Sequence, residues 1–203
     1  MTISVADSSR WSFVAQGAYA LFGPPRTVQS ALTGAGTGDF STTEAQRFLG
    51  VVSDPNVSSP QGFDLRHHQP NNLTGFSASV FFDRANNRYV LGIRGTESVV
   101  DIFEDVNRIG VQGFAGDQAV ALYRYYRKLT TAPGQPVNYS DSEAALLSAM
   151  RLGVFLNANA AIRIFGRSKL REELAKDVGS LPLDGSSASV LQPGAPLIVT
   201  GHS

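Results

Sequence analysis

The chain has 203 residues, no cysteine, and 17 basic against 17 acidic side chains, so its formal net charge is zero. This balance argues against a nucleic-acid partner, which would require a basic surface, and the lack of cysteine excludes disulfides and thiolate chemistry. The length supports one sizeable core, so we expect one domain or part of one. We expect no cofactor and no metal, because no residue pattern indicates a site for either.

The first residues give no sign of a cleavable secretory signal. The stretch from Met1 to Trp11 carries Asp7 and Arg10 and lacks an apolar core of signal-peptide length. The compartment therefore stays unknown, and secretion by another route stays open.

Two helices and a loop are predicted before residue 73. Apolar residues recur at helical spacing over residues 11–22, and Gly23-Pro24-Pro25 ends this pattern. Ser41 and Glu44 have the spacing of a capping box, which predicts a short helix over residues 45–51. The polar, turn-rich residues 54–72 predict a solvated loop, in which the neighbours His67 and His68 are poorly placed to share a metal.

From Phe76 the apolar period changes to two. Residues 76–82 alternate, residues 84–87 have turn chemistry, and residues 89–93 form the return strand of a β-hairpin. The second strand leads directly into Arg94-Gly95-Thr96 and then into a predicted helix with hydroxyl and acidic residues near its start. Backbone N–H groups at such a strand-to-helix turn can bind an anion.

A long helix with an apolar face over residues 120–129 follows, with Asp117 as its predicted N-cap. Ser140 and Glu143 then begin an apolar helix over residues 144–156, and a second helix is predicted over residues 168–178. Charged and amide residues interrupt the apolar stretch before it reaches the ~20 residues that span a bilayer.

The last seven residues form a continuous apolar run that ends in Gly201-His202-Ser203. Such a run is typical of a strand buried on both faces. A glycine two residues before a serine leaves room for the sharp turn on which an α/β-hydrolase exposes its nucleophile.

These motifs occur in the order found in a known family. The hairpin ending in Arg94-Gly95-Thr96, the later Asp105, and the C-terminal Gly-His-Ser resemble the class 3 lipases, the α/β-hydrolase family of the fungal triacylglycerol lipases. The likeness covers residues 73–128 and 197–203.

The resemblance implies the α/β class and the N-terminal part of an α/β-hydrolase fold, with a mostly parallel sheet flanked by helices. Residues 1–203 would form a single partial domain. Compact members of the family pass almost directly from the long helix to the nucleophile strand, whereas here about sixty residues intervene, too many for an ordinary loop. Residues 138–193 are therefore expected to be a helical insertion.

The resemblance also assigns roles to the motif residues. Ser203 would be the nucleophile, and Thr96 would form the oxyanion hole with its backbone N–H and hydroxyl. Asp105 would hold that hydroxyl, since a preorganised donor needs its own rotamer fixed by an acceptor. Gly95 and Gly201 would support the two turns. His202, adjacent to the serine, is expected to pack or support its turn rather than act as the base.

A serine hydroxyl needs a histidine base, and that histidine needs an acid. In α/β-hydrolases both follow the serine in the chain. We therefore expect the Asp and His to come from a C-terminal segment of the same enzyme beyond residue 203, and we expect the present chain to be inactive alone.

The expected activity is hydrolysis of a carboxylic ester through an acyl-enzyme. A lipid or long-chain acyl ester, such as a triacylglycerol or phospholipid, would be met at a membrane or lipid-droplet interface. Two alternatives stay open. One is a non-catalytic lipid-binding or partner-binding fragment, and the other is a small-ester esterase or peptidase on the same fold.

The apolar residues of the insertion also allow two interpretations. They could form a lid or acyl-binding wall over the serine, or they could be additional core. A rival lid would be residues 98–106, directly after the oxyanion residue. The residues expected to form the lid or acyl-binding wall are Leu146, Leu147, Met150, Val154 and Phe155.

Overall fold

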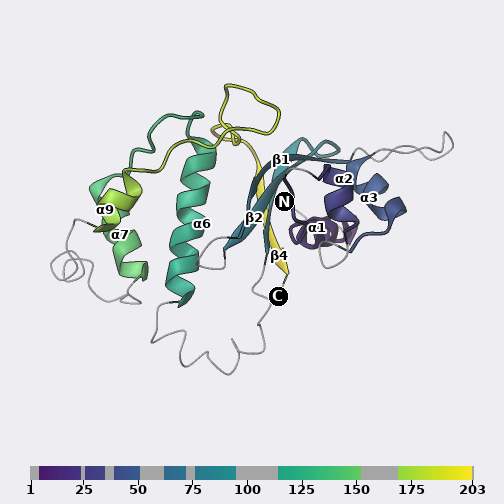
Figure 1. Ribbon diagram of the computed structural model, residues 1–203, viewed down its shortest axis with the longest axis horizontal. Coiled ribbons are helices and arrows are strands. Elements are labelled where there is room, and N and C mark those ends of the chain that lie inside the picture. The colour runs from purple at the N-terminus through teal and green to yellow at the C-terminus, as the bar shows by residue number, and fades with distance from the viewer. Residues whose placement is uncertain are drawn as a thin grey trace. The chain divides into compact units, whose positions relative to one another are not determined.

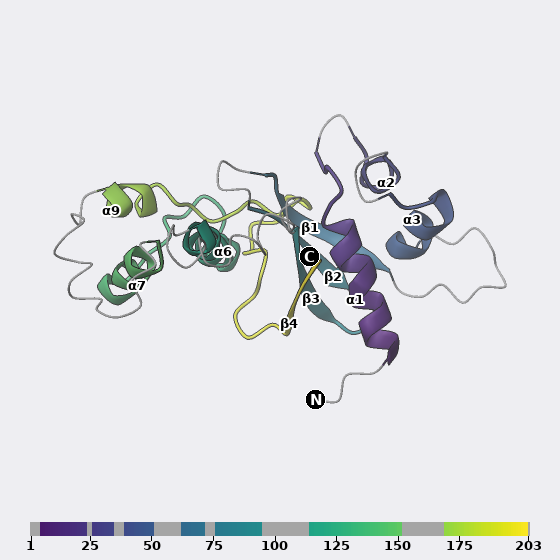
Figure 2. The ribbon, with the colours of Figure 1, turned by 90° about the horizontal axis from the view of Figure 1, so that it is seen from below.

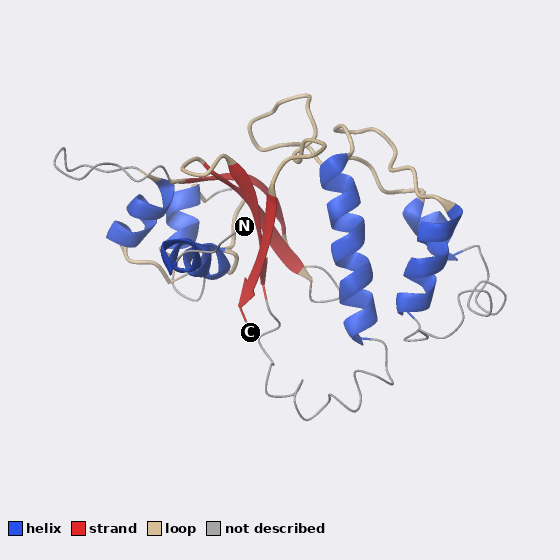
Figure 3. Ribbon diagram, turned by 180° about the vertical axis from the view of Figure 1, so that it is seen from behind, coloured by secondary structure: helices blue, strands red, loops and turns tan. Residues whose placement is uncertain are grey.

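The computed structural model describes residues 5–23, 26–34, 39–50, 62–71, 76–94, 114–151 and 169–202. The chain divides into two compact units. Unit 1 comprises Met1–Asn72, Ser77–Gly95 and Pro193–Ser203, and unit 2 comprises Leu73–Phe76 and Thr96–Gln192. All four described strands belong to unit 1, whereas the regular structure described in unit 2 is helical (Figure 3).

Unit 1 contains a mixed four-stranded sheet in the order β1-β2-β3-β4 (Figure 1). The strands are β1 (Phe63–Gln69), β2 (Ser77–Asp83), β3 (Arg88–Arg94) and β4 (Leu197–His202). The β1/β2 and β2/β3 pairs are antiparallel, and the β3/β4 pair is parallel. With its flanking helices, this sheet places the chain in the α/β class.

The expectation of a mostly parallel sheet is wrong for the described strands. Only residues 84–87 join β2 to β3, and only residues 70–76 join β1 to β2. A parallel crossover needs about a dozen residues or more, so both of these pairs must be antiparallel. The 102 residues between Arg94 and Leu197 are the one connection in this sheet long enough for a parallel pair.

Three helices of unit 1 are described: α1 (Val5–Gly17), α2 (Val28–Leu32) and α3 (Thr42–Leu49). The predicted first helix exists but begins earlier and ends at Gly17. The capping box of α3 is confirmed. The N–H of Glu44 donates to Ser41 Oγ at 3.2 Å, and the N–H of Ser41 donates to the Glu44 carboxylate at 2.9 Å. Gly50 ends α3 in the left-handed conformation, at φ 68°.

Helix α1 lies close against the sheet (Figure 2). The contact is close at Gly92 of β3, where an added Cβ would lie 3.0 Å from the Cβ of Ala18 and 3.1 Å from the carbonyl oxygen of Val14. Aromatic and aliphatic side chains from the helices and strands close the core around this contact. Its fully buried members include Val14, Leu32, Phe81 and Val90.

The predicted loop over residues 54–72 is wrong for its second half, which forms β1. The strand pairs with β2, but its register shifts between Leu65 and His67. This β-bulge interrupts the alternation of apolar and polar residues by which a strand is found in a sequence. His67 and His68 are consequently half-buried strand residues.

Unit 2 contains the long helix α6 (Phe114–Thr130), followed by α7 (Asp141–Arg151) and α9 (Lys169–Leu174). Asp117 lies inside α6 and is not its N-cap, because the helix begins three residues earlier. The predicted capping box of α7 is confirmed: the N–H of Glu143 donates to Ser140 Oγ at 3.2 Å, and the N–H of Ser140 donates to Glu143 Oε2 at 2.7 Å.

The insertion helices are packed against α6. A small core joins them, made of the buried residues Val120, Ala144, Leu147 and Leu174. Arg124 of α6 also binds both carboxylate oxygens of Asp177, just beyond α9, at 2.7 and 2.9 Å. Among the described helices, none is both long and apolar enough to cross a bilayer.

Candidate active site

The two strands that precede the predicted oxyanion and nucleophile residues are neighbours. In the parallel β3/β4 pair, Ile93 is aligned with Gly201 and Arg94 with His202. Carboxyl ends of parallel strands meet at one edge of a sheet, so β3 and β4 end side by side. Thr96 is two residues after Arg94 in the sequence, and Ser203 is one residue after His202.

Several predicted site residues lie outside the described part of the chain: Gly95, Thr96, Asp105, Val154, Phe155 and Ser203. Gly201 and His202 are described as the last two residues of β4. At Gly201 an added Cβ would meet the carbonyl oxygen of Ile93 at 3.5 Å, an ordinary contact distance. The described surroundings therefore do not by themselves require a glycine at this position.

A serine–histidine pair that the sequence did not indicate lies inside unit 1. Ser79 Oγ is 2.9 Å from Nδ1 of His68, and the edge of the imidazole also meets the ring of Phe22. Burial lowers the pKa of His68 to about 4, so the ring is neutral at pH 7. Because Ser79 has no exposed surface, a substrate cannot reach its hydroxyl in this structure, and we regard the pair as structural.

A second buried polar cluster surrounds Asp83, which has no exposed surface. One carboxylate oxygen accepts from Arg10 at 2.5 Å, and the other accepts from Asn86 at 2.8 Å. Arg88 completes the ion pairs at 3.5 Å. Asp83 thus ties α1 to the hairpin, with its carboxylate engaged by two guanidinium groups and an amide.

Carboxylates in unit 2 are likewise engaged by its own side chains. The hydroxyl of Tyr123 donates to Glu143 at 2.6 Å, and Arg127 binds the same oxygen. The hydrogen bond from Tyr123 is the largest of the contacts that lower the pKa of Glu143 to about 2. The hydroxyl of Tyr139 donates to Asp177 at 2.9 Å, and burial, followed by this carboxylate, raises the pKa of the phenol. The contacts of Glu143 attach α7 to α6, and the bond of Tyr139 joins the segment before α7 to the segment after α9.

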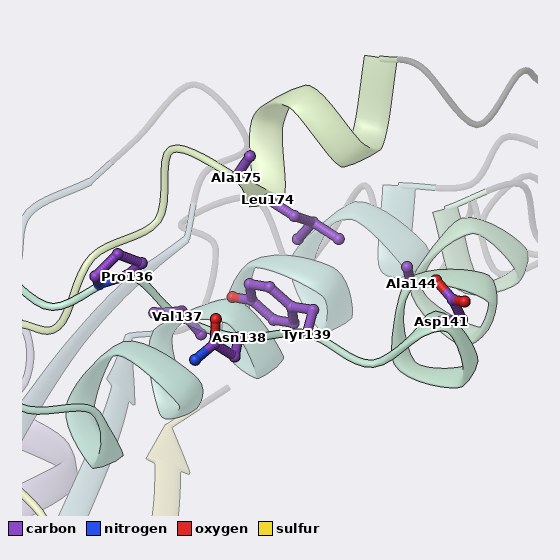
Figure 4. A pocket seen from close by; sticks show the side chains of 8 residues that line it. All are labelled: Pro136, Val137, Asn138, Tyr139, Asp141, Ala144, Leu174 and Ala175. Carbon is purple, nitrogen blue, oxygen red and sulfur yellow. The ribbon is translucent and has the colours of Figure 1, made fainter.

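A groove of about 350 Å³ lies between the end of α9 and the segment leading into α7 (Figure 4). Tyr139 lies at its centre in this view, with Leu174 and Ala175 on the α9 side. The remaining lining residues are Pro136, Val137, Asn138, Asp141 and Ala144. Of the residues predicted to form an acyl-binding wall, the three that the structure describes, Leu146, Leu147 and Met150, do not line the groove.

The three described members of that predicted wall differ in exposure. Leu147 is fully buried in the core of unit 2, and Met150 is partly buried against it. Leu146 is 53% exposed. Leu147 therefore belongs to the core, the alternative role raised above, while Leu146 has surface that a substrate could contact.

The part of the chain that the structure describes contains no group of three His, Asp or Glu side chains that could hold a metal ion.

Comparison with known proteins gives no match: no family model, no curated protein and no solved structure matches this chain.

Proposed function

We propose that this chain carries the nucleophile and half of the oxyanion hole of a serine hydrolase that cleaves carboxylic esters, with an α/β-hydrolase fold of the class 3 lipase type. Ser203 is the nucleophile, Thr96 the oxyanion donor and Asp105 its support. The alignment of Arg94 with His202 at the ends of two parallel strands carries the proposal.

This alignment is what the chemistry requires. In an α/β-hydrolase the nucleophile stands on the turn after one strand, and an oxyanion donor comes from the loop after another. Donors must lie 2.7–3.1 Å from the oxyanion, so the two strands must end close together. The chain satisfies this condition although 106 residues separate Thr96 from Ser203.

The reaction follows from these roles. Oγ of Ser203 attacks the ester carbonyl and gives its proton to a histidine base, and the oxygen of the tetrahedral intermediate is bound by Thr96. The alcohol leaves with a proton from that histidine, and water then hydrolyses the acyl-enzyme. His68 is hydrogen-bonded to Ser79, so we do not assign it as the base. We place the base and its acid after Ser203, in the chain order of α/β-hydrolases.

We further propose a lipid or long-chain acyl ester as the substrate. Leu146, exposed on α7 of the insertion, offers apolar surface of the kind that meets acyl chains. A small-ester esterase would share the same catalytic residues and would differ in its preference for chain length.

A fluorophosphonate probe tests the assignment of the nucleophile, because it reacts only with an activated serine. We expect labelling of the intact protein at Ser203, found by peptide mass spectrometry, and its loss in Ser203→Ala. Ser79→Ala is the matched control, since it removes the hydroxyl bonded to His68, and it should keep the label.

Labelling at Ser79 would contradict the proposal. Absence of label in protein shown to be folded would favour the non-catalytic binding alternative. Hydrolysis of p-nitrophenyl esters of increasing chain length then separates a lipase from a small-ester esterase.

A further inference from the structure

The edge of the sheet where β3 and β4 end is attached to helix α1. Helix α1 and the turn after it lie close to β3 at Gly92, where Val14 and Ala18 leave little room for a side chain. Two residues later, the guanidinium carbon of Arg94 lies 5.3 Å from the ring centroid of Tyr19, in the turn that follows α1. Arg94 is the last residue of β3 before Gly95 and Thr96.

The attachment is repeated at the other end of the strand. Arg88, the first residue of β3, lies with its guanidinium carbon 5.2 Å from the ring centroid of Trp11 in α1. Arginine over an aromatic ring is an attractive contact. Both ends of β3 are therefore in contact with α1 or the turn that follows it, and the Gly92 contact lies between them.

The two arginines lie at opposite ends of β3. Arg88 also pairs with the buried Asp83, so it completes the polar cluster in the core. Arg94 lies instead at the carboxyl end of β3, aligned with His202 of β4. Helix α1 contacts β4 as well as β3.

We propose that Arg94 and Tyr19 are positioning residues that fix the strand end from which the oxyanion turn begins. This inference rests on the proposed ester hydrolysis. Neither residue is assigned a part in the bond-forming steps themselves. Their contact determines where β3 ends relative to β4, and hence where the Thr96 donor starts relative to the nucleophile strand. A misplacement of about 1 Å can cost about a hundredfold in rate.

The test measures the reaction of the intact protein with a fluorophosphonate, separating reversible binding from the bond-forming rate. Arg94→Met and Tyr19→Leu should slow bond formation about tenfold to a hundredfold, with little change in binding. Arg94→Lys keeps a cation over the ring and Tyr19→Phe keeps the ring, so both should react close to the wild-type rate. Arg66→Met is the matched control, because it removes a similar contact, Arg66 over Phe82 at 5.2 Å, from another part of the sheet.

Hydrogen exchange gives a readout independent of activity. In Arg94→Met the amides of residues 92–94 should exchange faster, and in Arg66→Met they should not. Wild-type bond formation in Arg94→Met, or unchanged exchange at residues 92–94, would overturn the inference. If the wild type takes no label at Ser203, the proposed function fails, and exchange alone then decides whether Arg94 fixes the strand end.

Discussion

His68 shows how burial alone alters a titratable group in this protein. The ordinary pKa of histidine is about 6.5, and burial beside Phe22 and Ser79 lowers it to about 4. Between these pH values the unfolded chain binds a proton that the folded chain does not. Stability should therefore fall as the pH drops from 6.5 to 4, and no further on account of this group below 4.

We expect this loss to be about 1–2 kcal/mol, less than full linkage gives, because part of the ring faces solvent. Urea unfolding at pH 7, 5.5 and 4.5 measures it, and His68→Gln should flatten the dependence over that range. A proton titration of the His68 ring by NMR with a midpoint near 6.5 would contradict the prediction.

Other contacts at the residue scale were beyond prediction from the sequence. Arg10 and Asp83 are 73 positions apart, and nothing in either neighbourhood indicates that a helix residue will meet a buried carboxylate at a hairpin. Arg94 and Tyr19 are about as far apart in the sequence. Such pairs depend on how α1 packs on the sheet, which is a property of the assembled unit.

At the element scale, the sequence was sufficient to predict the structures that depend only on neighbouring residues. The two capping boxes and the hairpin over residues 77–94 are confirmed, because a cap or a tight turn is decided within a few residues. Strand β1 was missed because its bulge disrupts the alternation. The sheet was expected to be mostly parallel and is mixed, because residues 63–69, predicted as part of a loop, form a strand that adds a second antiparallel pair to the hairpin. For the site, the sequence identified the two strands whose ends the structure aligns.

Helix α7 carries the element-scale test of the lid interpretation. Leu146 is 53% exposed, whereas its neighbour Leu147 is buried. If α7 meets a lipid surface, Leu146→Ser should raise the apparent KM for an emulsified long-chain ester about tenfold, since inserting a leucine side chain is worth about 1.5 kcal/mol or more. Activity on a dissolved short-chain ester should not change.

Leu181→Ser is the matched control, because Leu181 is also exposed in unit 2 but lies outside α7. Equal effects of the two substitutions would indicate a general loss of apolar surface. No effect of Leu146→Ser on the emulsified ester would leave the insertion as additional core.

At the scale of the whole molecule, most of the sequence of unit 2, Thr96–Gln192, lies between β3 and β4 of unit 1. Each unit has its own buried core, around Phe81 and Val90 in the first and around Leu147 in the second. Cooperative units with separate cores commonly open separately under native conditions. The parallel β3/β4 pair nevertheless forms only when the chain returns from unit 2.

Leu147→Ala tests whether the two cores are independent. The substitution leaves a cavity beside Val120 and Leu174 and should destabilise unit 2 by about 3 kcal/mol. In native-state hydrogen exchange, the amides of α6 and α7 should then exchange faster, while those of β2 and β3 should keep their wild-type rates. Equal acceleration in the strands would show one cooperative unit, in which the strand ends at the candidate site depend on the helical core of the insertion.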